Sequence, residues 1–197
     1  MKILSWNCRG LSRPSAIRSL RVLIRNFNPD VIFLSETKSP PSQASSILNR
    51  LGFYLLSQFA PSGSSGGLLL AWRTGVDLDC FVLNKNYISA WCYSDPPNQP
   101  WLLSCIYGPP SRSDKPAFWD SFTSAGESFV NPWLCIGDLN HVLDQSEKYG
   151  GRPVASSSNC PFRQFIDHFG LLTLDSLVTI HMVQQQAGSW HYQREIR

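Results

Sequence analysis

The first 36 residues, MKILSWNCRGLSRPSAIRSLRVLIRNFNPDVIFLSE (residues 1–36), contain two short apolar runs separated by a segment with a different apolar period. Residues 3–6 form a β-prone run that ends in Asn7, and residues 31–34 are apolar at every position, as in a strand buried on both faces of a sheet. Between these runs, residues 14–27 carry apolar side chains at helical spacing, with arginines on another face. This order predicts a β-α-β unit.

After this unit, short strand-like runs follow one another with turn-forming residues between them, which predicts hairpins. Two longer helical segments interrupt them. The fold class is therefore α/β with a large antiparallel contribution. The expected elements are a short helix over 47–51 preceded by a loop or helix entry over 39–46, a turn over 61–67, strands over 68–72, 80–83, 88–93, 101–106 and 133–136, and helices over 116–129 and 160–169.

The composition excludes several classes of protein. With 197 residues, 43% of them hydrophobic and 16% charged, the chain can bury one core and is not intrinsically disordered. No apolar run approaches the roughly 20 residues of a membrane-spanning helix, and no signal peptide opens the chain. The six cysteines lack zinc-finger spacing, and we expect them to be small core residues of a protein in a reducing compartment. We expect an intracellular protein, nuclear or cytoplasmic, that is a monomer without a membrane partner.

The formal charge of +3 is unevenly distributed. Residues 1–50 carry eight basic and two acidic side chains, whereas residues 101–150 carry three and six. A basic helix over residues 13–26 could contact a DNA backbone, although basic helix faces are more often merely solvated.

Polar residues end four of the predicted strands. Side chains two positions apart on a strand share a face, and each of these series starts mainly apolar and ends polar. If the strands are neighbours that run toward one edge, their last side chains meet in one volume. The four series are Ile3-Ser5-Asn7, Ile32-Leu34-Glu36, Leu103-Cys105-Tyr107 and Leu134-Ile136-Asp138-Asn140.

Two carboxylates with amide oxygens suit Mg²⁺, which keeps several waters and binds together with substrate phosphate. Asp138 could act as a base toward a water, and Asn140 could orient that water or a phosphate oxygen. Each residue taken alone has a simpler explanation as a cap or turn, since Gly137-Asp138 is a common turn dipeptide.

Four motifs occur in the order and at about the spacing seen in the endonuclease/exonuclease/phosphatase superfamily: SWNCRG (5–10), SETK (35–38), IYGP (106–109) and GDLN (137–140). From residue 1 to about residue 174, the sequence most resembles the apurinic-type endonuclease domain at the N-terminus of plant LINE-type (non-LTR) retrotransposon polyproteins. The resemblance implies a four-layer sandwich, two packed mixed β-sheets flanked by helices. It also implies hydrolysis of a DNA phosphodiester with Mg²⁺, or with Mn²⁺ as an alternative ion.

The resemblance also implies roles for five residues. Glu36 resembles the metal ligand, and Asn7 resembles its neighbour in the metal site. Tyr107 looks like the phosphate-side tyrosine, and Asp138 and Asn140 look like the pair that aligns the attacking water and the scissile phosphate. The implied partners are DNA and, in a full-length relative, a reverse transcriptase domain.

Two later family motifs, a Leu-Asp-Arg-like motif and a terminal Ser-Asp-His motif, are absent, although residues 194–197 look like the approach to the first. In the family these motifs supply an acidic partner, a further metal-site Asp and a His that contacts the phosphate. We therefore expect one domain over 1–197 that lacks its C-terminal strands, with 175–197 as a divergent tail, and impaired activity. The chain's own histidines are expected at the surface or in loops: His141, His168, His181 and His191.

Two alternatives remain open. The chain could be a non-catalytic nucleic-acid-binding relic, which would retain DNA in a salt-sensitive, metal-independent manner without cutting it. It could also be a superfamily member that acts on a small phosphorylated substrate, although the opening WNCRGL (6–11) favours the nucleic-acid branch by resemblance.

Overall fold

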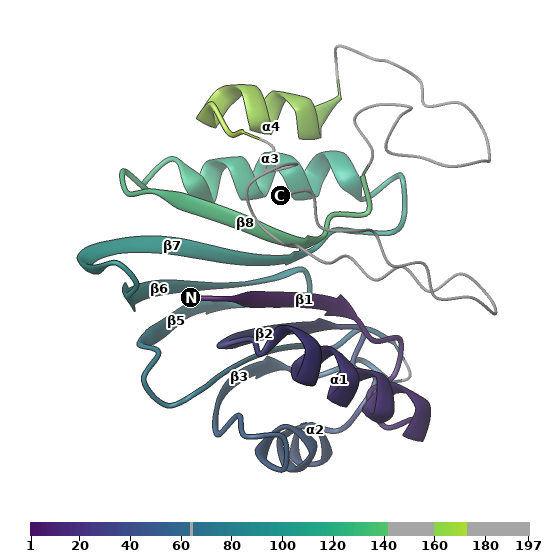
Figure 1. Ribbon diagram of the computed structural model, residues 1–197. Helices are drawn as coiled ribbons and strands as arrows, with labels where there is room; N and C mark the ends of the chain where they lie inside the picture. The colour runs from purple at the N-terminus through teal and green to yellow at the C-terminus, as the bar shows by residue number, and fades with distance from the viewer. Residues whose placement is uncertain (64, 142–159, 173–197) are drawn as a thin grey trace. The chain divides into compact units, whose positions relative to one another are not determined.

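The computed structural model describes residues 1–63, 65–141 and 160–172, which form an α/β fold with two mixed four-stranded sheets and four helices (Figure 1). The described chain divides into two compact units. The first contains Met1–Tyr107 and Asn131–Asp138, and the second contains Gly108–Val130 and the described residues from 139 onward. The predicted tail over 175–197, with His181 and His191, lies outside the described residues.

The first sheet contains the predicted β-α-β unit. Its strands are β1 (Ile3–Asn7), β2 (Val31–Ser35), β3 (Leu55–Phe59) and β4 (Leu68–Trp72), in the order β1-β2-β4-β3. β1 and β2 are parallel, so the chain between them must cross over, and α1 (Pro14–Phe27) makes that crossover. The other pairs are antiparallel.

One helix and one strand of this part of the chain differ from the sequence prediction. The helix expected over 47–51 is α2 (Pro41–Asn49), which starts earlier because Pro41 occupies its first turn, where the missing proline N–H costs nothing. β3 was not predicted. It is an edge strand whose side chains are partly buried or exposed, so it lacks the strong apolar alternation by which strands are recognised.

The second sheet is mainly antiparallel, as the predicted hairpins require. Its strands are β5 (Leu78–Leu83), β6 (Tyr87–Ser94), β7 (Pro97–Tyr107) and β8 (Trp133–Asp138), in that order. β7 and β8 are parallel and in register from Leu102↔Trp133 to Tyr107↔Asp138. The last pair places two candidate residues side by side.

The first unit has two apolar cores, one on each face of the first sheet. Leu20 of α1 and Leu48 of α2 pack with Leu34 on the outer face. Phe33 and Ile136 pack between the two sheets on the inner face. Three of the predicted layers, namely helices, first sheet and second sheet, are thus present in this unit (Figure 1).

The cysteines of the described chain are free, as predicted. Cys92 and Cys105 are fully buried in the core between the sheets. Burial raises the pKa of the Cys105 thiol well above its ordinary value, so this sulfur behaves as a core hydrophobe.

The second unit is built around aromatic side chains. Trp119 of α3 (Lys115–Gly126) lies 4.5 Å from Phe162 and 5.2 Å from Phe165 of α4 (Pro161–Phe169), measured between ring centroids. Phe118 and Phe122 are buried, as their helical spacing predicts.

His141 lies in a loop, as the sequence predicts, but it is only partly exposed and packs against aromatic side chains. Its Nδ1 accepts a hydrogen bond from Trp119 Nε1 over 3.3 Å, and its ring lies 5.1 Å from that of Phe162. Burial, followed by the charge of Lys115, lowers the pKa of His141. No sequence pattern predicts this packing, because the contacts come from two helices that are separate in the chain. His168 is exposed on α4, as predicted.

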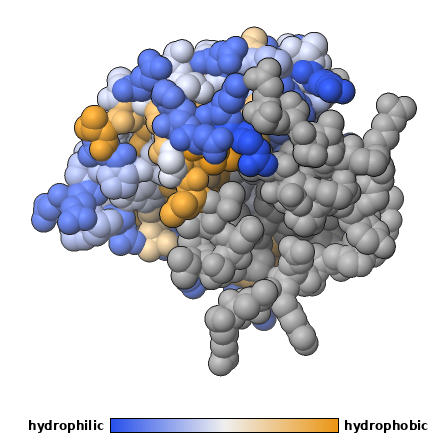
Figure 2. Space-filling model, turned by 90° about the horizontal axis from the view of Figure 1, so that it is seen from above, coloured by the Kyte–Doolittle hydropathy of each residue, from blue (hydrophilic) through white to orange (hydrophobic). Residues whose placement is uncertain are grey.

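No helix among the described residues is both long and apolar enough to cross a bilayer. The described part of the face drawn in Figure 2 is mostly hydrophilic, with separate hydrophobic patches.

Candidate functional site

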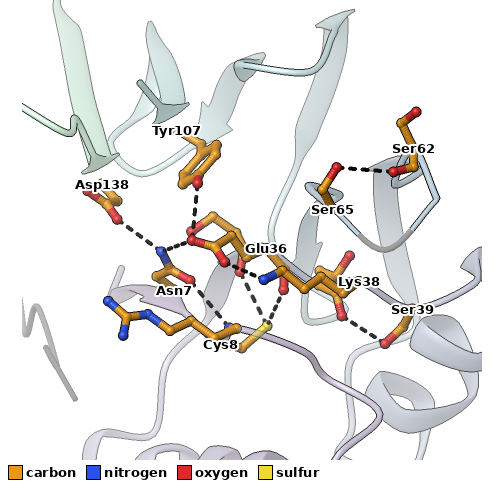
Figure 3. Close-up of polar contacts among 12 residues, drawn as sticks. Asn7, Cys8, Glu36, Lys38, Ser39, Ser62, Ser65, Tyr107 and Asp138 are labelled. Carbon is orange, nitrogen blue, oxygen red and sulfur yellow. Dashed lines mark hydrogen bonds and ion pairs between the residues drawn. The ribbon is translucent and has the colours of Figure 1, made fainter. Parts of the chain in front are cut away.

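Four of the five candidate residues meet in the first unit, at the ends of four strands (Figure 3). Asn7 ends β1, Glu36 directly follows β2, Tyr107 ends β7 and Asp138 ends β8. The parallel pairs β1–β2 and β7–β8 bring these ends to a common edge of each sheet. The sequence prediction that these side chains converge is confirmed.

A continuous set of hydrogen bonds links the four side chains. Asn7 Nδ2 donates to Glu36 Oε1 over 2.8 Å and to Asp138 Oδ2 over 3.0 Å. The Tyr107 hydroxyl donates to Glu36 Oε1 over 3.0 Å. Asn7 therefore joins one carboxylate from each sheet.

Glu36 reaches this cluster by a route that strand alternation does not predict. Alternation places Glu36 on the same face as Ile32 and Leu34, and that face is covered by α1 and α2. Instead, Glu36 has a left-handed backbone conformation with φ +51°, as does Lys38 with φ +48°. β2 ends at Ser35, and this turn directs the Glu36 side chain toward Tyr107. The face predicted for Glu36 is thus wrong, although its place in the cluster is right.

Backbone contacts hold the left-handed segment in position. The N–H groups of Thr37 and Lys38 donate to the carbonyl oxygens of Gly67 and Gly66, both over 3.1 Å. Gly67 has φ +88°, and a Cβ there would lie 2.3 Å from Thr37 Oγ1, so only glycine fits. The position of Glu36 therefore depends on a loop about 30 residues further along the chain.

A second glycine fixes Asp138. Gly137 has φ +142°, and a Cβ there would lie 1.9 Å from the Ile106 carbonyl oxygen. The absence of a side chain lets β8 approach β7 closely at the point where Tyr107 and Asp138 pair.

Lys38 is a site residue to which the sequence analysis assigned no role. Its Nζ lies 2.9 Å from Glu36 Oε2, the carboxylate oxygen that Asn7 and Tyr107 leave free. The only signal in the sequence was a cation two positions after the acid, and neighbours at that spacing on a strand are not normally assigned as an ion pair.

Glu36 is held in its charged form. Burial by itself raises the pKa of this carboxyl, but hydrogen bonds from Lys38, and then from two further side chains, outweigh burial and set the pKa below its ordinary value. A carboxylate that stays ionised near neutral pH is a competent ligand for a hard cation.

The donor set of this cluster fits a magnesium-type ion held mainly by water. Glu36 and Asp138 supply two carboxylates within reach of one amide, and Mg²⁺ usually takes one or two carboxylates and keeps several waters. Within the described ranges, no group of three or more His, Cys, Asp or Glu side chains could hold a metal. Asn7 presents its amide nitrogen to the carboxylates, while its Oδ1 accepts from the backbone N–H of Arg9 over 3.3 Å. A direct ligand role for Asn7 would need this amide to turn over.

Asn140, the fifth candidate residue, belongs to the second unit. Its Nδ2 donates to the Gly108 carbonyl oxygen over 2.7 Å, and its own carbonyl oxygen accepts from the Lys115 ammonium group. These bonds fix its backbone in a left-handed conformation with φ +49°.

Solved structures with a similar fold include three AP endonucleases. That from Archaeoglobus fulgidus has a TM-score of 0.61 at 15% identity, over 76% of this chain and 61% of its own. AP endonuclease LMAP from Leishmania major has a TM-score of 0.62 at 16% identity, over 83% and 65% of the two chains. The Xenopus laevis APE2 catalytic domain has a TM-score of 0.60 at 16% identity, over 86% and 67%.

The chain therefore spans about two thirds or less of the first two of these structures, and identities this low show a common fold. No curated protein matches the sequence. Residues 4–191 match the endonuclease/exonuclease/phosphatase family. Since that match covers nearly the whole sequence, and the neighbouring structures have the same fold, the chain belongs to the endonuclease/exonuclease/phosphatase family.

Proposed function

We propose that this chain is a metal-dependent phosphodiesterase domain that cuts the DNA backbone, of the kind found in plant LINE-type retrotransposons. The observation that carries the proposal is the Asn7 amide, which hydrogen-bonds Glu36 and Asp138 and so gathers two carboxylates from two sheets. The family match supports phosphate-ester hydrolysis. DNA as substrate is supported by the AP endonucleases that share the fold, and the retrotransposon origin rests on the four sequence motifs.

Each of the four clustered residues would have a separate role in hydrolysis. Asp138 would take a proton from the attacking water, whose oxygen bonds to phosphorus as the bond to the leaving sugar oxygen breaks. Glu36 would hold Mg²⁺, or Mn²⁺, with Asn7 beside it. The bound ion would neutralise phosphate charge and stabilise the developing oxyanion. Tyr107, which already orients Glu36, would face the phosphate. Asn140 keeps the water- or phosphate-aligning role that its motif implies.

A plasmid-nicking assay on the full 197-residue chain tests this proposal. Supercoiled plasmid is incubated with the chain in Mg²⁺ and in excess EDTA, and with the isosteric variants Asp138→Asn and Glu36→Gln. Loss of a general base costs about 10²- to 10⁴-fold, so we expect Asp138→Asn to reduce the nicking rate by at least about 100-fold. The matched control is Asp79→Asn on β5, an exposed carboxylate outside the cluster, which should leave the rate unchanged.

Other outcomes would decide against the proposal. Nicking that persists in EDTA, or that is insensitive to Asp138→Asn, contradicts it. DNA retention without cleavage supports the relic, and hydrolysis of small phosphate esters without nicking supports the small-substrate alternative. The low rate expected from the two absent motifs stays a prediction, and a wild-type rate comparable to that of a complete family member would refute it.

A further inference from the structure

α1 carries a row of three exposed arginines. At 3.6 residues per turn, Arg18, Arg21 and Arg25 fall within about 60° of one another, so they form one stripe along the helix. The buried residues of the same helix, Ala16, Leu20 and Leu23, lie on the opposite side against the first sheet. The stripe therefore points directly away from the core.

Among the residues that the structure describes, no acidic side chain forms an ion pair with this arginine row. α1 contains no Asp or Glu, and the only acidic residues before residue 50 are Asp30 and Glu36. Asp30 accepts a hydrogen bond from the Lys2 backbone N–H, and Glu36 is engaged in the site. Across the described residues, no ion pair involves any arginine of the row.

The stability of α1 does not explain the row. Arg25, in the last turn, interacts favourably with the helix dipole, but Arg18 and Arg21 lie outside the last turn, where the dipole gives a cation no benefit. Like charges three and four positions apart repel one another by a few tenths of a kcal/mol. The row is a local cost to the helix, which an anionic partner would remove.

The spacing of the row suits a nucleic-acid backbone. Arg18 and Arg25 are about 10 Å apart along the helix axis, at about 1.5 Å per residue. Phosphates of one DNA strand follow one another at about 3.4 Å along the duplex axis, so three guanidinium groups over this length can each pair with a phosphate. Guanidinium groups bind phosphate oxygens in bidentate geometry.

We infer that the arginine row of α1 (Arg18, Arg21 and Arg25) is a sequence-independent contact surface for the backbone of double-stranded DNA. The inference deepens the proposed function and rests on it for the choice of DNA as the polyanion. It adds residues that none of the four sequence motifs contains. Because such contacts release counterions, they should appear as a steep salt dependence of binding.

The test is DNA binding by the full chain in EDTA, measured by fluorescence anisotropy with a labelled 20-base-pair duplex from 50 to 200 mM KCl. The variant is Arg18→Gln/Arg21→Gln/Arg25→Gln, since glutamine keeps helix propensity and removes charge. Each lost phosphate contact lowers the slope of log K against log salt by about one, so we expect a loss of about three and binding about 10- to 100-fold weaker at 50 mM.

Two controls distinguish an effect of the arginine row on the salt slope from an effect of net charge. Arg18→Lys/Arg21→Lys/Arg25→Lys keeps the charge and should keep most of the salt slope. Arg50→Gln/Lys85→Gln/Arg112→Gln removes the same charge from scattered exposed positions and should change the slope by about one or less. Circular dichroism checks that α1 is retained in each variant.

An unchanged slope in the triple Gln variant, or an equal loss in the scattered control, overturns the inference. Binding of polyglutamate that depends on the row, with no binding of DNA, also overturns the inference. That result would indicate that the surface binds an acidic protein. Because binding is measured without metal, this test is independent of the proposed hydrolysis, and each proposal can be refuted without the other. Asp138-dependent nicking with an unchanged slope refutes only the surface, and row-dependent binding without any nicking refutes only the hydrolysis.

Discussion

Asn7 and Asp138 are 131 positions apart in the sequence, yet Asn7 Nδ2 donates a hydrogen bond to Asp138 Oδ2 over 3.0 Å. The bond joins β1 of the first sheet to β8 of the second, two strands that are in contact in the first unit. Because the same nitrogen also donates to Glu36, one neutral amide separates two carboxylates that would otherwise repel each other.

Replacing Asn7 by aspartate should make the stability of the chain dependent on Mg²⁺. Asn7→Asp puts a third carboxylate between Glu36 and Asp138, so the metal-free form should melt at a lower temperature than the wild type. Mg²⁺ bound only by the folded chain would restore stability by mass action. Thermal melts with and without 10 mM Mg²⁺ measure the difference. Asn7→Ala is the control, and a Mg²⁺ effect no larger in Asn7→Asp than in Asn7→Ala would contradict this prediction.

Removing the Tyr107 hydroxyl should lower the free energy of unfolding. Tyr107→Phe deletes a donor to the Glu36 carboxylate; a hydrogen bond to a charged group contributes about 1.5 to 3 kcal/mol, and this one is only part-buried. We expect a loss of about 1 kcal/mol in the free energy of unfolding, measured in urea. Tyr93→Phe removes an exposed hydroxyl on β6 and serves as the matched control. Equal stabilities of the two variants would show that the Tyr107 bond contributes nothing.

The loop that holds Glu36 should not tolerate a side chain at Gly67. Gly67→Ala places a Cβ against Thr37 Oγ1 and also forces alanine to φ +88°, so we expect a loss of more than about 2 kcal/mol. Gly66→Ala is the control, because Gly66 has φ +71° but nothing within 4 Å of its would-be Cβ. It should lose only the conformational cost of a left-handed alanine, about 1 to 2 kcal/mol. Similar urea midpoints for the two variants would refute the steric argument.

The second unit should lose stability in mild acid through His141. Its pKa is lowered in the folded chain, first by burial and then by Lys115, so the unfolded chain binds the proton more readily. The stabilising contribution is therefore present above the ordinary pKa of 6.5 and is lost as the pH falls below it. Urea midpoints at pH 7.5 and 5.5 should differ more for the wild type than for His141→Gln. His168→Gln, at an exposed position, should behave like the wild type.

The elements that rest on periodicity could be predicted from the sequence. The β-α-β opening, the antiparallel hairpins and the polar ends of β1, β7 and β8 follow from two simple repeats, every second residue on a strand and every third or fourth on a helix. The same repeats placed Asn7, Tyr107 and Asp138 on the face of the sheets where the structure has them.

The features that depend on contacts between distant segments could not be predicted in this way. Glu36 turns toward the site because Gly66 and Gly67 hold its loop in a left-handed conformation, which no local pattern encodes. β3 forms because β4 offers it a partner edge, and His141 is partly buried because α3 and α4 supply the rings around it. Local periodicity reports which face a residue takes within its own element, whereas long-range packing determines which elements meet and where a chain departs from its period.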